Sequence, residues 1–150
     1  MNTYSSFGYG YTKLDKYNGI GANYMHCGYC WAITRKMYEC IGGLYETSII
    51  GSGDYQIACS LIDRVHKSVP NECSIEYKND LIEYQNKLKT ARLGYVPGTI
   101  LHYFHGSKEN RKYVERNSII IKNQFDPVKD IIKDENGIIQ RNIKRNYSIK

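Results

Sequence analysis

Two acidic side chains on one glycine-flanked stretch of this 150-residue chain are the first candidates for chemistry. Glu46 follows the pair Gly42-Gly43, and Asp54 closes the run Gly51-Ser52-Gly53-Asp54 just before an apolar segment. A carboxylate in such a loop can serve as a general base that accepts the proton of a substrate hydroxyl. Asp54 is also an ordinary N-cap for the helix predicted to follow it, and the two roles are compatible.

Two histidines, His102 and His105, precede Gly106 at the end of a β-branched and aromatic run. Imidazoles placed in this way bind divalent metals such as Mn²⁺ or Zn²⁺. Side chains three residues apart on a strand point to opposite faces, so the spacing also fits one structural histidine with its partner at the surface. The pattern leaves both interpretations open.

The pair Cys27 and Cys30, with His26 beside it, is a third candidate. Together with His102 and His105 it would form a Cys2His2 zinc site. The alternative is free thiols flanking a strand. An odd total of five cysteines favours free thiols in a reducing compartment over a disulfide framework.

A basic group follows the histidines, formed by Lys108, Arg111 and Arg116. On a helix predicted over Glu109–Asn123, these side chains would bind a phosphate, since arginines near a helix start favour anions. A solvated basic face is the alternative.

The hydrophobic periodicity predicts the elements that position these residues. Residues 1–23 show no helical or strand period, and a strand is expected over Tyr29–Thr34, with a short helix before Gly42. The remaining predictions are a helix from Asp54 to Pro70, a helix over Ser74–Leu93, a strand over 99–104 and a hairpin that pairs Asp130–Lys133 with Gly137–Gln140.

Length and composition predict a single domain, 1–150, ending in a basic tail at 142–150. No run approaches the roughly 18 apolar residues of a membrane span, and no leader pattern opens the chain, so we expect a soluble, cytoplasmic protein. The net charge of +6 favours anionic partners. The charge is spread and lysine is abundant throughout, which makes nucleic acid an unlikely partner.

Five sequence runs, taken in order, resemble the C-terminal, acceptor-side half of GT-A-fold, family-2-like glycosyltransferases. The runs are GYCWAITR, GGLYE, GSGD, GYVPGTILHYFHGSKxNRxYxxR and FDPxxDI, and they cover about residues 26 to 138. The resemblance implies an α/β fold, of α+β character in this part, with a short mixed sheet packed by helices. It also implies transfer of a sugar from a nucleotide-sugar to a glycan or other hydroxyl acceptor.

The resemblance further implies roles for individual residues. Asp54 matches the acid that deprotonates the acceptor, Trp31 matches an aromatic residue beneath it, and His102 or His105 matches the histidine ligand of Mn²⁺. The acceptor pocket would be shaped by Gly42, Gly43 and Glu46 with the loop Gly51, Ser52 and Gly53. Arg111, Tyr113 and Arg116 match the helix that follows.

The chain departs from this family in lacking an Asp-x-Asp motif and a nucleotide-binding half. We therefore expect a domain that transfers sugar only with a protein partner supplying that half. Two alternatives remain: a carbohydrate-binding or interaction domain that has lost the reaction, and a basic, zinc-stabilised nucleic-acid-binding module.

Overall fold

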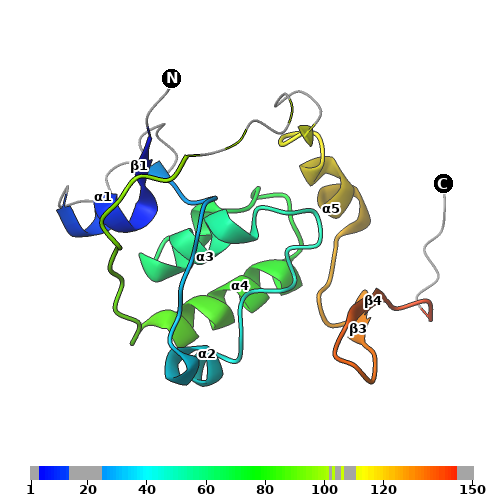
Figure 1. Ribbon diagram of the computed structural model, residues 1–150. Helices are drawn as coiled ribbons and strands as arrows, with labels where there is room; N and C mark the ends of the chain where they lie inside the picture. The colour runs from blue at the N-terminus through cyan, green and yellow to red at the C-terminus, as the bar shows by residue number, and fades with distance from the viewer. Residues whose placement is uncertain (1–3, 14–24, 102, 104–105, 107–110, 145–150) are drawn as a thin grey trace.

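The computed structural model describes residues 4–13, 25–101, 103, 106 and 111–144 (Figure 1). Within them the fold is mixed α/β, with five α-helices and two separate two-stranded sheets. The helices are α1 (Phe7–Lys13), α2 (Arg35–Ile41), α3 (Gly53–Leu61), α4 (Ile75–Leu88) and α5 (Asn117–Asn123), with a 3-10 turn, η1 (Val65–Lys67). The strands are β1 (Ser5–Ser6), β2 (Met25–His26), β3 (Ile131–Lys133) and β4 (Ile139–Arg141).

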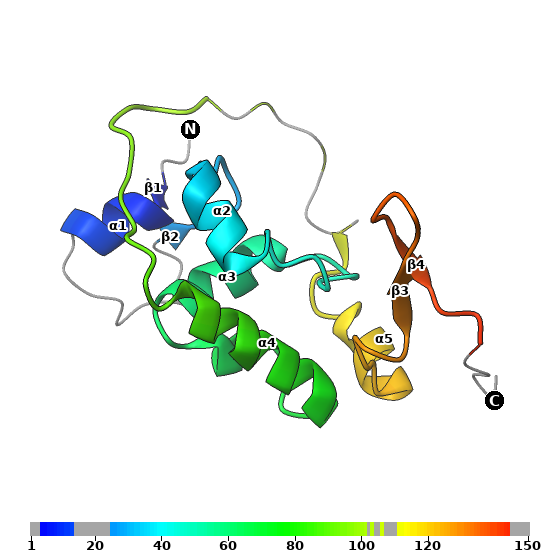
Figure 2. The ribbon, with the colours of Figure 1, turned by 90° about the horizontal axis from the view of Figure 1, so that it is seen from below.

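Helix α4 forms the centre of the main hydrophobic core, with α3 packed beside it (Figures 1 and 2). Tyr77, Leu81, Tyr84 and Leu88 recur every three to four residues along α4, which places them on one buried face. The Ser74 hydroxyl caps the helix by accepting the Tyr77 N–H, at 3.2 Å. The predicted helix is therefore confirmed, but it ends at Leu88 and not at Leu93.

Helix α2 follows the sequence prediction closely. Thr34 caps its first turn by accepting the Met37 N–H, and Gly42 ends it in the left-handed conformation with φ 76°. A glycine meets this backbone requirement without the penalty of a Cβ atom. The short helix and the glycine break after it are confirmed.

The strand predicted over Tyr29–Thr34 is wrong, because these residues join neither sheet of the described part. The nearest strand among the described residues is β2, which pairs in parallel with β1 in the register Ser5–Met25 and Ser6–His26, and α2 begins directly after Thr34. Residues 7–13, for which the sequence shows no helical period, form α1. Its Phe7 is buried against Ala58 of α3, a contact between distant segments that local periodicity cannot reveal.

The C-terminal hairpin is confirmed, with β3 antiparallel to β4 (Figure 1). The Asp134 side chain accepts the N–H groups of Asn136 and Ile138, both at 2.9 Å, and Gly137 takes a left-handed φ of 77° in the turn. The preceding Asp126 is buried and accepts the backbone N–H of Val128, so the FDP run builds a turn.

The other element predictions are wrong in extent. Helix α3 ends at Leu61 because Asp63 takes a left-handed φ of 59°, and a left-handed φ at Lys112 (44°) precedes α5, which begins only at Asn117. Residues 99–101 and 103 carry no strand, and 102 and 104 lie outside the described residues. In place of one short mixed sheet, the described residues form two unconnected pairs of strands.

Candidate functional site

The loop that precedes α3 has a strained left-handed backbone. Gly51 and Ser52 have φ values of 89° and 72°, and the Gly51 N–H donates to the Ser48 carbonyl at 2.8 Å. Ser52 precedes the first residue of α3, so the prediction of Asp54 as N-cap is wrong. Asp54 lies instead in the first turn, where the helix dipole favours a carboxylate.

A neighbouring segment of the chain lies against the Asp54 carboxylate. The Cys27 thiol is 3.8 Å from Asp54 Oδ2, and a Cβ atom built on Gly28 would lie 2.7 Å from the same oxygen. Burial, and then the Asp54 charge, raise the pKa of Cys27 to about 12. Cys27 is therefore a protonated thiol that donates weakly to Oδ2 of the half-buried Asp54, and Oδ1 accepts no hydrogen bond from the residues that the structure describes.

Aromatic rings lie on the same segment. The Trp31 indole N–H donates to the Cys27 carbonyl at 2.7 Å, and its ring lies 5.6 Å from Phe7 while 39% of the residue stays exposed. His26 stacks on Tyr29 at 4.2 Å and accepts the Gly28 N–H through Nδ1 at 3.0 Å. Trp31 is thus linked to Asp54 through Cys27, which contacts both residues. Trp31 lies in a loop and not in the predicted strand.

Arg116 contacts the loop at Ser52, from which it is 64 residues away in sequence. Its Nη2 donates to Ser52 Oγ at 2.6 Å, and a Cβ atom on Gly51 would lie only 2.8 Å from its Nη1. The guanidinium also lies over the Tyr113 ring, at 4.8 Å, while its buried Nε has no partner among the described residues. Ser52 makes no side-chain cap of α3, because its hydroxyl binds Arg116 instead.

The other basic candidates are placed differently. Arg111 donates to the Tyr113 hydroxyl at 2.7 Å, so it joins Arg116 around one ring, but in a turn before α5 and not on a long helix. Lys108 lies outside the described residues. A phosphate-binding role for this group stays a prediction.

Glu46 does not join Asp54. Its carboxylate binds the ammonium of Lys133 on β3 at 2.5 Å, and this hydrogen bond raises the pKa of Lys133. Gly42 and Gly43 lie at the end of α2, where a Cβ atom on Gly43 would lie 3.5 Å from the Tyr38 hydroxyl. The structure thus separates the predicted acceptor residues into two groups, one at Asp54 and one facing the hairpin.

The described residues do not form a metal-binding site. His102 and His105 lie outside them, and within the described ranges no three His, Cys, Asp or Glu side chains gather closely enough to hold an ion. His26, Cys27 and Cys30 therefore form no zinc site by themselves. All five cysteines are free; Cys59 and Cys73 are buried, and Cys40 is exposed.

A cavity of about 370 Å³ opens beside the left-handed loop. Gly51 and Ser52 line one side, with Lys67 and Asn117 among the polar residues around it. Its volume falls within the range of about 300–1,000 Å³ that is usual for small-molecule sites. The sequence identifies the glycine loop as a candidate site. It does not indicate that Cys27 and Gly28 contact Asp54, because this contact depends on the tertiary fold.

No protein-family model, curated protein or solved structure matches this chain. In the part of the chain that the structure describes, no helix combines the length and apolar character needed to cross a membrane.

Proposed function

We propose that this chain is the acceptor-side domain of a GT-A-fold, family-2-like glycosyltransferase, which transfers a sugar from a nucleotide-sugar to a hydroxyl acceptor. One observation carries the proposal: Asp54 ends the four-residue loop Gly51–Asp54, and Arg116, which is 64 residues from Ser52 in sequence, binds Ser52 of the same loop. A base and a cation at one loop are what displacement of a diphosphate by a hydroxyl requires, and Gly51 and Ser52 of this loop line the cavity.

The chemistry follows from these two groups. The free oxygen of the Asp54 carboxylate accepts the proton of the acceptor hydroxyl, whose oxygen then forms the bond to the anomeric carbon. The bond from that carbon to the nucleoside diphosphate breaks, and the leaving group departs with the electron pair. Arg116 offsets its negative charge, and the cavity beside Gly51 and Ser52 gives the substrates room.

Three further parts of the proposal rest on the sequence. His102 or His105 would bind Mn²⁺, which would stabilise the diphosphate, but the chemistry derived above does not run through a metal. A protein partner or another part of a longer chain would supply the nucleotide-binding half. The five free thiols support a reducing compartment such as the cytoplasm.

A titration of isotope-labelled protein with UDP and UDP-hexoses, with and without Mn²⁺, tests the location of the site. We expect the largest amide shifts at Gly51–Asp54, and we expect Arg116→Gln to weaken binding roughly ten- to a hundredfold, since a charge-assisted bond is lost. Arg35→Gln is the control, because Arg35 is exposed and its ion pair within the described ranges is with Glu39 of its own helix. Shifts confined to the basic residues beyond 140, or equal effects of the two variants, would contradict the assignment.

A second candidate, saccharide binding without transfer, is favoured by Trp31, a residue that is 39% exposed and donates to the carbonyl of Cys27, whose thiol contacts Asp54. Aromatic faces commonly carry the apolar side of a sugar ring. This candidate predicts sugar binding that is independent of Mn²⁺ and of the nucleotide, which the same titration made with the free hexose in place of the UDP-hexose distinguishes.

A further inference from the structure

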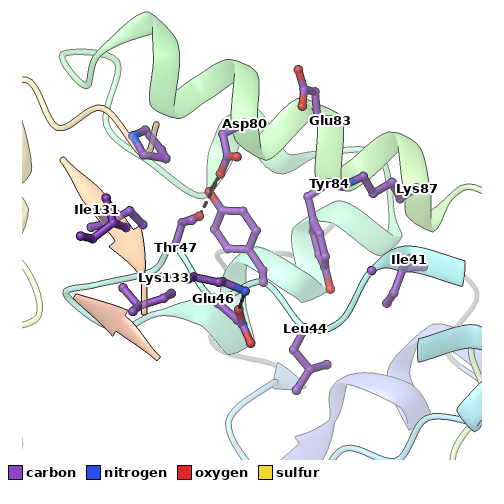
Figure 3. A pocket seen from close by; sticks show the side chains of 15 residues that line it. Ile41, Leu44, Glu46, Thr47, Asp80, Glu83, Tyr84, Lys87, Ile131 and Lys133 are labelled. Carbon is purple, nitrogen blue, oxygen red and sulfur yellow. Dashed lines mark hydrogen bonds and ion pairs between the residues drawn. The ribbon is translucent and has the colours of Figure 1, made fainter. Parts of the chain in front are cut away.

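A second cavity, of about 270 Å³, lies away from the left-handed loop, between α4, the segment after α2 and the β3–β4 hairpin (Figure 3). Three segments that are far apart in sequence supply its walls, so it exists only in the folded chain. Apolar side chains of Ile41, Leu44, Ile131 and Ile139 form part of the lining. Nothing in the chemistry proposed for Asp54 uses this cavity.

Asp80 places a partly used carboxylate in this cavity. Its Oδ2 accepts the Tyr45 hydroxyl at 2.6 Å and the Thr47 hydroxyl at 2.8 Å. Figure 3 shows Thr47 beside Asp80. A carboxylate offers about four acceptor positions, and Oδ1 has no hydrogen-bond partner among the described residues. Asp80 is half-buried, so acceptor capacity remains at the cavity wall.

The same face of α4 contributes both acidic and basic side chains to the lining of the cavity. Glu83 and Lys87 follow Asp80 at helical spacing and line the cavity, and the ion pair of Glu46 with Lys133 lies on the opposite side. The cavity therefore offers both hydrogen-bond donors and acceptors, with only one more acidic than basic group in its lining.

Tyr84 contributes an aromatic wall and an unused hydroxyl. Only 6% of the residue is exposed, and its buried hydroxyl has no hydrogen-bond partner in the described part of the chain. Burial raises the pKa of Tyr84 to about 12, a rise limited by the nearby Tyr45 backbone, so the hydroxyl stays protonated. A buried group of this kind marks a place where a water or a ligand completes the hydrogen bonding.

We propose that this cavity binds one ring of a neutral saccharide. Such a ring presents hydroxyls that both donate and accept, and it has an apolar face for the isoleucines and for Tyr84. The cavity is slightly smaller than typical drug-sized sites, which suits a single ring.

One residue of the cavity lining, Tyr45, has its backbone close to the loop that ends at Asp54. The Tyr45 carbonyl lies 3.8 Å from a Cβ position built on Gly53, the residue before Asp54. We assign the bound ring to the part of an acceptor glycan beyond its reacting hydroxyl. This last assignment rests on the proposed function, whereas saccharide binding does not.

Titrations with N-acetylglucosamine, galactose and protonated glucosamine, followed by amide shifts of the full chain, test the proposal. We expect the neutral sugars to bind, and we expect Glu83→Gln and Lys87→Gln each to weaken binding about three- to tenfold, the effect of one lost hydrogen bond. Glu76→Gln and Lys89→Gln are matched controls, because Glu76 of α4 and Lys89 just after it are exposed and do not line the cavity. The controls should change binding less than twofold.

The proposal is overturned if no neutral sugar binds, if the cavity variants bind like their controls, or if glucosamine binds at least tenfold more tightly than N-acetylglucosamine. The last result would identify a site for cations. Saccharide binding at this cavity without any transfer would leave the cavity site standing and reject the proposed reaction. Sugar transfer with an acceptor KM that is unchanged by Glu83→Gln and Lys87→Gln would support the proposed reaction and reject the cavity as the acceptor site.

Discussion

At the scale of single residues, the contact between Cys27 and Asp54 decides what each side chain can do. A half-buried thiol beside a carboxylate cannot readily lose its proton, since both its partial burial and the neighbouring charge disfavour the thiolate. Cys27 is thus excluded as a nucleophile at neutral pH. Asp54, whose second oxygen the thiol does not engage, is the group left to accept a proton.

Alkylation of the native protein with iodoacetamide measures this contact. We expect the exposed Cys30 and Cys40 to react first and Cys27 slowly, because a thiol with a pKa of about 12 has very little thiolate near neutral pH. Asp54→Asn removes a negative charge, lowers the pKa of Cys27 and should speed its labelling roughly two- to tenfold. Labelling of Cys27 as fast as Cys30 in the wild-type protein, read by mass spectrometry, would show that the contact is absent.

At the scale of elements, α4 organises the core, and Ser74 fixes where it begins. The Ser74 hydroxyl accepts the Tyr77 N–H and donates to the Phe125 carbonyl, so one buried side chain caps α4 and ties it to the segment after α5. Thr34 caps α2 in the same way but makes no second bond to another element in the described residues.

Replacing each cap with alanine separates the two effects. Ser74→Ala should lower the free energy of unfolding by about 2–3 kcal/mol, through the lost cap and the carbonyl left buried without a donor. Thr34→Ala should cost about 1 kcal/mol, the cap alone. Chemical denaturation of both variants checks the difference, and equal losses would mean that the bond to Phe125 contributes nothing.

The same scale shows which elements could be predicted from the sequence. Helix α2, its Gly42 end and the Asn136-Gly137 hairpin are confirmed because their signals are local, namely a capping threonine and glycines at left-handed positions. Helix α1 is missed and the strand over Tyr29–Thr34 is wrong because both depend on packing between distant segments. Helix α3 is predicted too long because apolar spacing continues past Asp63, where the backbone turns.

At the scale of the whole molecule, the fold brings segments that are distant in sequence to the loop at Asp54. The sequence identifies Asp54, its glycine loop and Arg116 as candidates, and the fold brings Arg116 onto Ser52 and the Cys27–Gly28 segment onto Asp54. The fold places Glu46 against the hairpin and not beside Asp54. No local pattern could indicate this placement, because the partner of Glu46, Lys133, is 87 residues away in sequence. The glycosyltransferase assignment, the histidine metal site and the partner half stay proposals.

The decisive measurement is the rate of sugar transfer by wild-type protein and by Asp54→Asn, each assembled with its nucleotide-binding half. Asparagine keeps the shape of Asp54 and removes its ability to accept a proton. We therefore predict a fall in kcat of at least about a hundredfold, the usual contribution of a general base, with the acceptor KM changed much less. Glu76→Gln, an equivalent loss of charge on α4, should leave the rate unchanged. An Asp54→Asn protein that transfers sugar at the wild-type rate would contradict the assignment of Asp54 as the base.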